Sequence, residues 1–247
     1  MTSKRFSTPF ALVAMSAALA LTGCGDKGGA ASGDAVAKTA APAGQSWSQK
    51  VVATDDGMMM GNPDAPIKLV EFASFTCSHC AEFSEKGVPE LVRDFVNTGQ
   101  VSYELRPFIR DPLDLTIATV TFCAGPERFF PLAENAFASQ PALFEAAQAN
   151  PNAAQNLGAL PEKDRFPTLA RAWKLDQFFA SRGIAASELN SCLSDPAKIN
   201  KRTEVTERSG RQYEISGTPT FLINGEVVPD AAAWEPLRDA LRAAGAR

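Results

Sequence analysis

The sequence predicts an α/β fold that is interrupted by an all-helical insertion, and three observations lead to this prediction. An apolar, β-branched segment at 67–75, a helical pattern at 81–97 and an alternating segment at 101–105 form a β-α-β unit. Residues 111–195 then show only helical spacings of Leu, Phe, Ala and Trp. A helix, two strands and a final helix follow from residue 196 onward, so the α/β pattern resumes after the insertion.

The composition excludes several classes of protein. Of 247 residues, 45% are hydrophobic and 21% charged, which is typical of a soluble globular protein. The net charge is -4, so the chain has no cationic excess for nucleic acid and we expect no nucleic-acid partner. A single His removes most histidine-dependent catalysis and metal chemistry. The five Cys are therefore the residues that need an explanation.

The N-terminus has the pattern of an export signal. Lys4 and Arg5 precede an uncharged apolar run that is too short for a membrane-spanning helix. The run ends at Leu21-Thr22-Gly23-Cys24, which resembles the lipobox of bacterial lipoproteins. The resemblance implies that residues 1–23 are a signal peptide and that Cys24 is acylated as the first residue of the mature chain. An ordinary signal peptide or an accidental Cys remains the alternative.

Residues 24–50 are predicted to be the lipidated Cys and a flexible tether. Gly, Ala, Ser and Thr dominate this stretch, and such a composition buries too little apolar surface to offset its conformational entropy. Together with the lipobox, the tether predicts a periplasmic protein held by lipid to a bacterial membrane, which the sequence does not identify as inner or outer. Export also places the other four Cys in an oxidising compartment.

The first β-α-β unit and the insertion have recognisable boundaries. Turn residues at 62–66 precede the first strand, and Pro89 predicts a kink or a split in the helix that follows. The insertion is expected to hold three to five short helices, with breaks at 125–126, 151–152 and 183.

The C-terminal elements have equally clear signals. Asp195 before Pro196 predicts an N-cap with Pro in the first turn of a helix that extends to about Tyr213. Residues 220–228 predict two strands joined by an Asn-Gly turn. A final helix is expected within 231–244, with its start near Pro236.

Cys77-Ser78-His79-Cys80 lies where the first strand ends and the helix begins. Unpaired N–H groups and the dipole at a helix N-terminus stabilise a thiolate, so the pKa of Cys77 should be low. His79 can add a hydrogen bond or a positive charge to the same sulfur. Cys80, one turn further along, is expected to be the buried resolving thiol. These interactions favour the dithiol over the disulfide, which makes the oxidised pair an oxidant.

The residues from Val70 to Cys80 resemble the active-site stretch of DsbA-family thiol-disulfide oxidoreductases of the thioredoxin superfamily. Gly217-Thr218-Pro219-Thr220-Phe221 resembles the cis-proline loop of the same family. The resemblance implies a thioredoxin fold divided into 51–110 and 196–247, with a helical domain at 111–195. It also implies a cis bond at Thr218-Pro219 and a Thr218 backbone that pairs with substrate. Ser78 departs from the Pro of the best-known oxidase of the family, which leaves the strength of oxidation open.

Glu71 is expected to point into the apolar interior. By strand alternation it shares a face with Ile67, Leu69, Ala73 and Phe75. Burial would raise the pKa of its carboxyl. The family resemblance implies that an acid at this position helps to move the proton of the buried Cys. The alternative is a solvated or paired residue at the edge of the sheet.

Cys123 and Cys192 both fall in the predicted helical insertion, 69 positions apart. In an oxidising compartment, two unclaimed Cys most simply form a structural disulfide. Closing a loop of about 70 residues contributes roughly 4 kcal/mol in the chain-entropy model. Two inert buried thiols, or a second redox pair that tunes the first, are the alternatives.

The leading hypothesis is a monomeric oxidase that needs no cofactor and no metal. It would introduce disulfides into reduced exported proteins through Cys77 and Cys80, and a membrane redox partner would reoxidise the pair. A disulfide isomerase, or a reductase kept reduced by a membrane partner, is the alternative within the same chemistry. A lipoprotein that binds copper or zinc through its Cys and His79 is the alternative from another class.

Overall fold

A mixed β-sheet organises the computed structural model, which describes residues 1–2, 34–155 and 157–247. In the described part of the chain the sheet has six strands in the order β1-β2-β4-β3-β5-β6, of which β3 and β4 pair in parallel and the other neighbours antiparallel. The strands are β1 Val51–Ala53, β2 Met58–Gly61, β3 Ile67–Ala73, β4 Val101–Pro107, β5 Thr220–Ile223 and β6 Glu226–Val227. All but residues 1 and 2 of the expected signal peptide, together with Cys24, lie outside the described residues.

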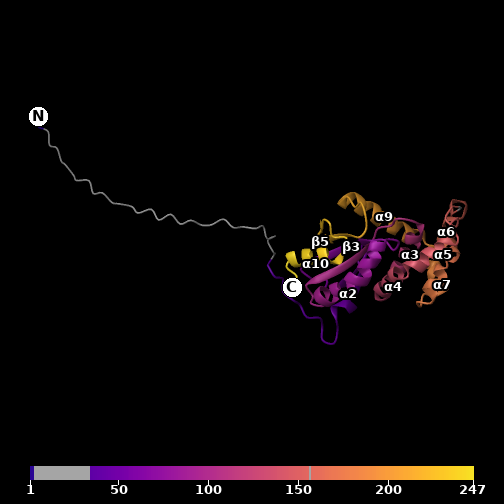
Figure 1. Ribbon diagram of the computed structural model, residues 1–247, viewed down its shortest axis with the longest axis horizontal. Helices are drawn as coiled ribbons and strands as arrows, with labels where there is room; N and C mark the ends of the chain where they lie inside the picture. The colour runs from indigo at the N-terminus through magenta and orange to yellow at the C-terminus, as the bar shows by residue number, and fades with distance from the viewer. Residues whose placement is uncertain (3–33, 156) are drawn as a thin grey trace. The chain divides into compact units, whose positions relative to one another are not determined.

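The predicted order of elements is confirmed, including the helical insertion between β4 and β5. The helical elements are η1 Trp47–Gln49, α1 Ser78–Glu82, η2 Phe83–Gly87, α2 Val88–Leu91, η3 Val92–Val96, α3 Pro112–Cys123, α4 Pro126–Ala138, α5 Gln140–Gln148, η4 Leu157–Ala159, α6 Glu162–Ala172, α7 Leu175–Ala180, α8 Ala186–Leu193, α9 Pro196–Tyr213 and α10 Trp234–Ala243. Figure 1 shows α3 to α7 grouped to the right of β3, with α10 beside β5.

The insertion contains more helices than the sequence predicts. Its described residues form the six α-helices α3 to α8, against an expected three to five. The missed boundaries are at Ser139, between α4 and α5, and at Lys174, which adopts a left-handed conformation with φ 57° between α6 and α7. Pro141 in the first turn of α5 was a usable signal for the first boundary, whereas a lysine gives no sign of positive φ.

The helical path after β3 is continuous but not uniform. From Ser78 to Val96 it passes through α1, η2, α2 and η3, and both η2 and η3 are π-helical. Pro89 lies in the first turn of α2, directly after the π-helical η2. The predicted interruption near Pro89 therefore takes the form of π-helical turns on either side of α2.

The C-terminal elements agree closely with the prediction. Asp195 caps α9, because its side chain accepts a hydrogen bond from the backbone N–H of Ala197 at 3.0 Å. Asn224 and Gly225 have φ of 52° and 91° between β5 and β6, as a tight hairpin turn requires. The final helix, α10, begins at Trp234, two residues before the predicted start.

Two short strands, β1 and β2, were missed by the sequence analysis. They form an antiparallel hairpin, and β2 pairs in turn with β4. The Asp56-Gly57 dipeptide between them is a usual hairpin signal, but three- and four-residue strands are too short to show alternation.

The prediction of a flexible tether is wrong for its described second half. The backbone N–H of Val36 donates to Gly245 at 3.0 Å, and that of Thr39 donates to Thr98 at 2.9 Å. Trp47 is 7% exposed, and its indole N–H donates to the carbonyl of Thr39 at 2.7 Å. An average composition conceals isolated anchors such as the large aromatic side chain of Trp47.

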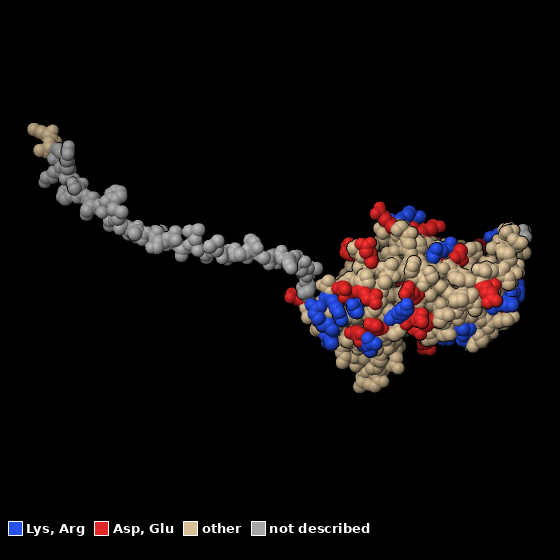
Figure 2. Space-filling model, viewed as in Figure 1, with Lys and Arg blue, Asp and Glu red and all other residues tan. Residues whose placement is uncertain are grey.

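The hydrophobic core lies between the helices and one face of the sheet. Ile67, Leu69 and Ala73 of β3 belong to this main core, whereas Val70 and Phe72 face a smaller cluster on the opposite side. This alternation follows from the period of two along a strand and fixes which side chains of β3 point toward α1. On the face shown in Figure 2, acidic and basic side chains are intermixed.

Candidate active site

Sheet pairing brings the two sequence motifs together. β5 pairs antiparallel with β3, and Phe72 lies opposite Thr220. The residues just before Thr220 therefore lie beside the loop that follows β3 and leads to Cys77. The Thr218-Pro219 peptide bond is cis, and the thiol of Cys77 donates a hydrogen bond to the carbonyl of Thr218 at 3.0 Å.

Cys77 occupies the N-cap position of α1, with extended backbone angles. Its pKa falls from 9.0 to about 4, chiefly because the Cys80 thiol donates a hydrogen bond to the thiolate. Burial opposes this change, while the Thr218 hydroxyl and the backbone N–H groups of Cys80 and His79 add to it. Because the Thr218 hydroxyl has no partner within the described residues while Cys77 is a thiol, it is free to donate once the thiolate forms.

Cys80 has the opposite character. It is 0% exposed against 4% for Cys77, and both are free thiols. Burial raises the pKa of Cys80 well above its usual value, and the hydrogen bond to Cys77 raises it further. Within one helical turn, the pair therefore combines a thiol that ionises readily, Cys77, with a thiol that retains its proton, Cys80.

The imidazole of His79 does not share in this arrangement. Its side chain is exposed, and no hydrogen bond joins it to Cys77 in the described structure. His79 lowers the pKa of Cys77 through its backbone N–H.

Glu71 lies 2% exposed on the core side of β3, as strand alternation predicts. Burial raises the pKa of its carboxyl to about 8; the negative charge of Cys77 adds to this and a hydrogen bond from Tyr103 opposes it. Tyr103 was missed by the sequence analysis. It lies on β4 opposite Leu69. A detectable signal was present, because Tyr103 is one of only two Tyr in the sequence and lies at an inward position of an alternating strand.

Two side chains of the helical insertion hold the loop before Cys77. The sequence analysis missed both. The amide of buried Gln140, on α5, donates to the carbonyls of Phe75 and Cys77 at 2.9 and 2.8 Å. Buried Asp114, on α3, accepts from the hydroxyl of Ser74 at 2.6 Å and from the N–H of Phe75 at 2.8 Å. No sequence pattern links these residues to the loop, because the contacts span 39 to 65 positions.

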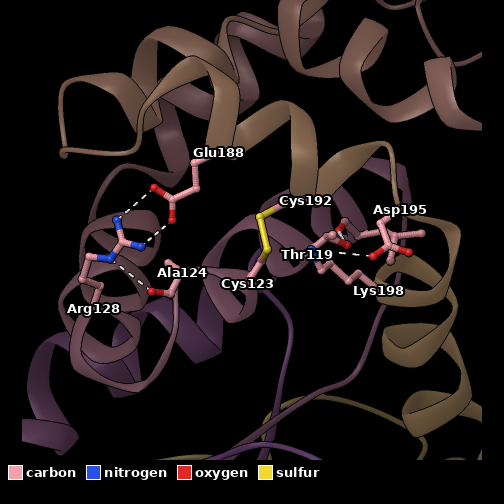
Figure 3. Close-up of a disulfide and its surroundings, with 9 residues drawn as sticks. Thr119, Cys123, Ala124, Arg128, Glu188, Cys192, Asp195 and Lys198 are labelled. Carbon is pink, nitrogen blue, oxygen red and sulfur yellow. Dashed lines mark hydrogen bonds and ion pairs between the residues drawn. A yellow bond between two sulfur atoms is a disulfide. The ribbon is translucent and has the colours of Figure 1, made fainter.

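Cys123 and Cys192 are joined by a disulfide with a Cα–Cα distance of 6.0 Å. Figure 3 shows this bond connecting α3 to α8, with the Arg128–Glu188 ion pair on one side and Lys198 with Asp195 on the other. The bond thus links two helices of the insertion and, among the described residues, leaves Cys77 and Cys80 as the free thiols.

The described residues contain no group of three or more His, Cys, Asp or Glu side chains placed to hold a metal ion. None of the helices formed by these residues is long and apolar enough to cross a membrane.

Comparison with known proteins places the chain in a family. The family model described as thioredoxin matches residues 53–243. The crystal structure of a protein-disulfide isomerase from Novosphingobium aromaticivorans is 34% identical, with a TM-score of 0.72 over 78% of this chain and 99% of that chain. The structure of Wolbachia pipientis α-DsbA1, at 22% identity and a TM-score of 0.57, covers 76% of this chain and 83% of that chain and supports the same fold.

Curated relatives are more distant. A Rickettsia bellii protein named "Putative protein-disulfide oxidoreductase" is 25% identical over 69% of this chain, which spans 58% of that relative's length. Disulfide bond formation protein D of Bacillus subtilis is 24% identical over 74% of each chain. With the thioredoxin match, the cis-proline loop beside Cys77 and the inserted helices, these similarities agree: the chain belongs to the thioredoxin family.

Proposed function

We propose that this protein introduces disulfides into exported proteins through Cys77 and Cys80. The observation that carries the proposal is the contrast between the two thiols: the pKa of Cys77 falls to about 4, while that of Cys80 rises well above its usual value. A thiolate that is stabilised only in the reduced protein favours the dithiol. The oxidised pair therefore tends to accept electrons from a client.

The proposed reaction starts from the Cys77–Cys80 disulfide. A client thiolate attacks the sulfur of Cys77, forms a mixed disulfide and releases Cys80 as a thiolate, which takes up a proton. A second client thiolate then attacks the client sulfur of the mixed disulfide and releases Cys77 as a thiolate. The client leaves with a new disulfide, and the enzyme keeps the two electrons as one thiolate and one thiol.

Glu71 is proposed to supply and remove the proton of Cys80. A carboxyl with a pKa of about 8 is largely protonated at neutral pH. In its ionised form, its negative charge raises the pKa of Cys80, so the two groups are coupled electrostatically. The carboxyl can give a proton to Cys80 when the disulfide opens and accept one when the pair is reoxidised. Thr218 and Pro219 are proposed to receive the client peptide through the Thr218 backbone, next to Cys77.

The cellular setting is part of the proposal. Cys24 is proposed to carry the lipid that holds the protein to a bacterial membrane on the periplasmic side. A membrane redox partner would accept the two electrons and restore the disulfide. Replacing Cys24 by Ser should release the protein from the membrane fraction and remove the mass of the acyl chains; an unchanged distribution would contradict the anchor.

The reaction is tested by substitution of the two thiols. Cys80→Ala should accumulate mixed disulfides with disulfide-containing clients, because its Cys77 thiolate can attack a client disulfide and release one client thiolate, but the resolving thiol is gone. Cys77→Ala should abolish oxidative refolding of a reduced protein. The double variant Cys123→Ser with Cys192→Ser is the control and should retain turnover. Full activity in Cys77→Ala would overturn the mechanism.

Isomerisation is the second candidate, favoured by the 34% identity to a structure named as a protein-disulfide isomerase. Two measurements separate the candidates. A reduction potential of Cys77–Cys80 that is more oxidising than glutathione supports the oxidase. Rescue of scrambled, fully oxidised substrate by the reduced protein supports the isomerase.

A further inference from the structure

A pocket of about 500 Å³ lies beside the Cys123–Cys192 disulfide, between the end of α3 and the first turns of α9. Phe122 and Cys123 line one wall. The other wall carries three cationic side chains, Lys198, Lys201 and Arg202. Their spacing of three and four places them on one face of α9, so the pocket collects three positive charges and no acidic residue lines it.

Nearby acids neutralise only part of this charge. Asp195 is 3.6 Å from the ammonium of Lys198. Asp56 is 3.9 Å from Lys201, but the same carboxylate also pairs with Arg106 and Arg208. Arg106 has a second partner, Glu104. Asp195 and Asp56 still face the three pocket cations and Arg208, so the pocket keeps a positive surplus in a chain whose overall charge is negative.

Arg202 is the least compensated of the three cations. Its guanidinium lies over the ring of Phe122, 4.5 Å from the ring centroid, and no ion pair or side-chain hydrogen bond joins it to any described residue. Burial lowers its pKa to about 10, and the charge of Asp56 opposes the shift only in part. A partly buried cation without a counter-ion is costly, and a bound anion would remove that cost.

We propose that this pocket binds the phosphate group of a small organic phosphate. The planar guanidinium of Arg202 can donate two hydrogen bonds to phosphate oxygens, and the two lysines can act as point charges on the remaining ones. Phe122 and the adjacent disulfide offer an apolar surface to the organic part. A volume of about 500 Å³ lies within the range of small-molecule sites.

The proposal is tested by isothermal titration of the full chain with phenyl phosphate at constant ionic strength. Phenyl phosphate should bind at one site, inorganic phosphate more weakly, and neutral phenol not at all. Arg202→Gln and Lys198→Gln should each weaken binding by about tenfold, as expected for loss of a charge-assisted hydrogen bond. Lys163→Gln, which removes an exposed charge on α6 of the same insertion, is the matched control and should change nothing.

Three results would overturn the proposal: no binding of phenyl phosphate, unchanged binding in Arg202→Gln, or equal losses in Arg202→Gln and Lys163→Gln. If Arg202→Gln fails to fold, Lys198→Gln and the charge-conserving Arg202→Lys carry the test. Arg202→Lys should bind phenyl phosphate more weakly than the unmodified protein, because a lysine cannot donate the bidentate hydrogen bonds of the guanidinium. Affinity equal to that of the unmodified protein in both of these variants would overturn the proposal.

Discussion

The side-chain amide of Gln140 donates a hydrogen bond of 2.8 Å to the carbonyl of Cys77, across 63 positions of sequence. A helix of the insertion thereby holds the backbone of the reactive cysteine. The same amide donates to Phe75, so one buried side chain fixes the loop on both sides of Thr76. The insertion consequently contributes directly to the geometry of the active site.

Gln140→Ala should therefore raise the pKa of the Cys77 thiol. Without the Gln140 amide, the carbonyls of Phe75 and Cys77 lose a hydrogen-bond donor, and the negative ends of their dipoles disfavour a nearby thiolate. The backbone at the N-cap position of Cys77 also becomes less firmly held. Unfolding should become easier by about 1–3 kcal/mol, the usual cost of leaving buried polar groups with too few partners. Thiolate absorbance against pH measures the first effect and urea denaturation the second.

Gln148→Ala, an exposed position on the same helix, is the control and should leave both quantities unchanged. A loss of stability in Gln140→Ala with no change in the pKa of Cys77 would reduce Gln140 to a purely structural role.

The contribution of Cys77 to the stability of the reduced protein should grow as pH rises from 4 to 9. In this window Cys77 is deprotonated in the native protein, with a pKa of about 4, but protonated in the unfolded chain, whose pKa is 9.0. The unfolded state then binds more protons, so the contribution of Cys77 is complete above pH 9 and is lost as pH falls through 4. The oxidised protein has no such contribution. Denaturant unfolding of both redox forms should show that the stability of the reduced form falls relative to that of the oxidised form as pH falls, and a constant difference would contradict the low pKa.

Glu71 should act in the opposite direction. Its native pKa of about 8 exceeds the ordinary 4.5, so its contribution is complete below pH 4.5 and is lost as pH rises through 8. The largest cause is burial, which does not depend on the redox state, so the effect is best measured in the oxidised protein.

Glu71→Gln should remove this loss, which amounts to at most about 5 kcal/mol across the window. Glu226→Gln, at an exposed position of β6, is the control and should keep the original pH dependence. If the unmodified oxidised protein and Glu71→Gln show the same slope of stability against pH, Glu71 does not titrate as inferred.

Removal of the Cys123–Cys192 bond should lower the unfolding free energy by roughly 4 kcal/mol, because the bond closes a long loop. The double variant Cys123→Ser with Cys192→Ser avoids a lone thiol, and urea denaturation measures the change. The pKa of Cys77 should stay the same if the bond is only a brace. A shift in that pKa would instead favour the alternative of a second redox pair that tunes the first.

The sequence by itself determined the features that depend on a few neighbouring residues. The cap at Asp195, the hairpin at Asn224-Gly225 and the inward direction of Glu71 are set by turn chemistry and strand alternation. The position of Cys77 and Cys80 at the start of a helix is equally local, as it follows directly from the end of β3.

The tertiary structure decided everything that needs distant segments to meet. Gln140 and Asp114 reach the loop before Cys77, Tyr103 reaches Glu71, and Trp47 anchors a segment that composition alone assigns to a tether. These contacts depend on how helices and strands pack. The sequence spacing of polar residues such as Gln and Asp does not predict which buried group each will bind. Local patterns therefore specified the reactive thiols, while packing specified the groups that control them.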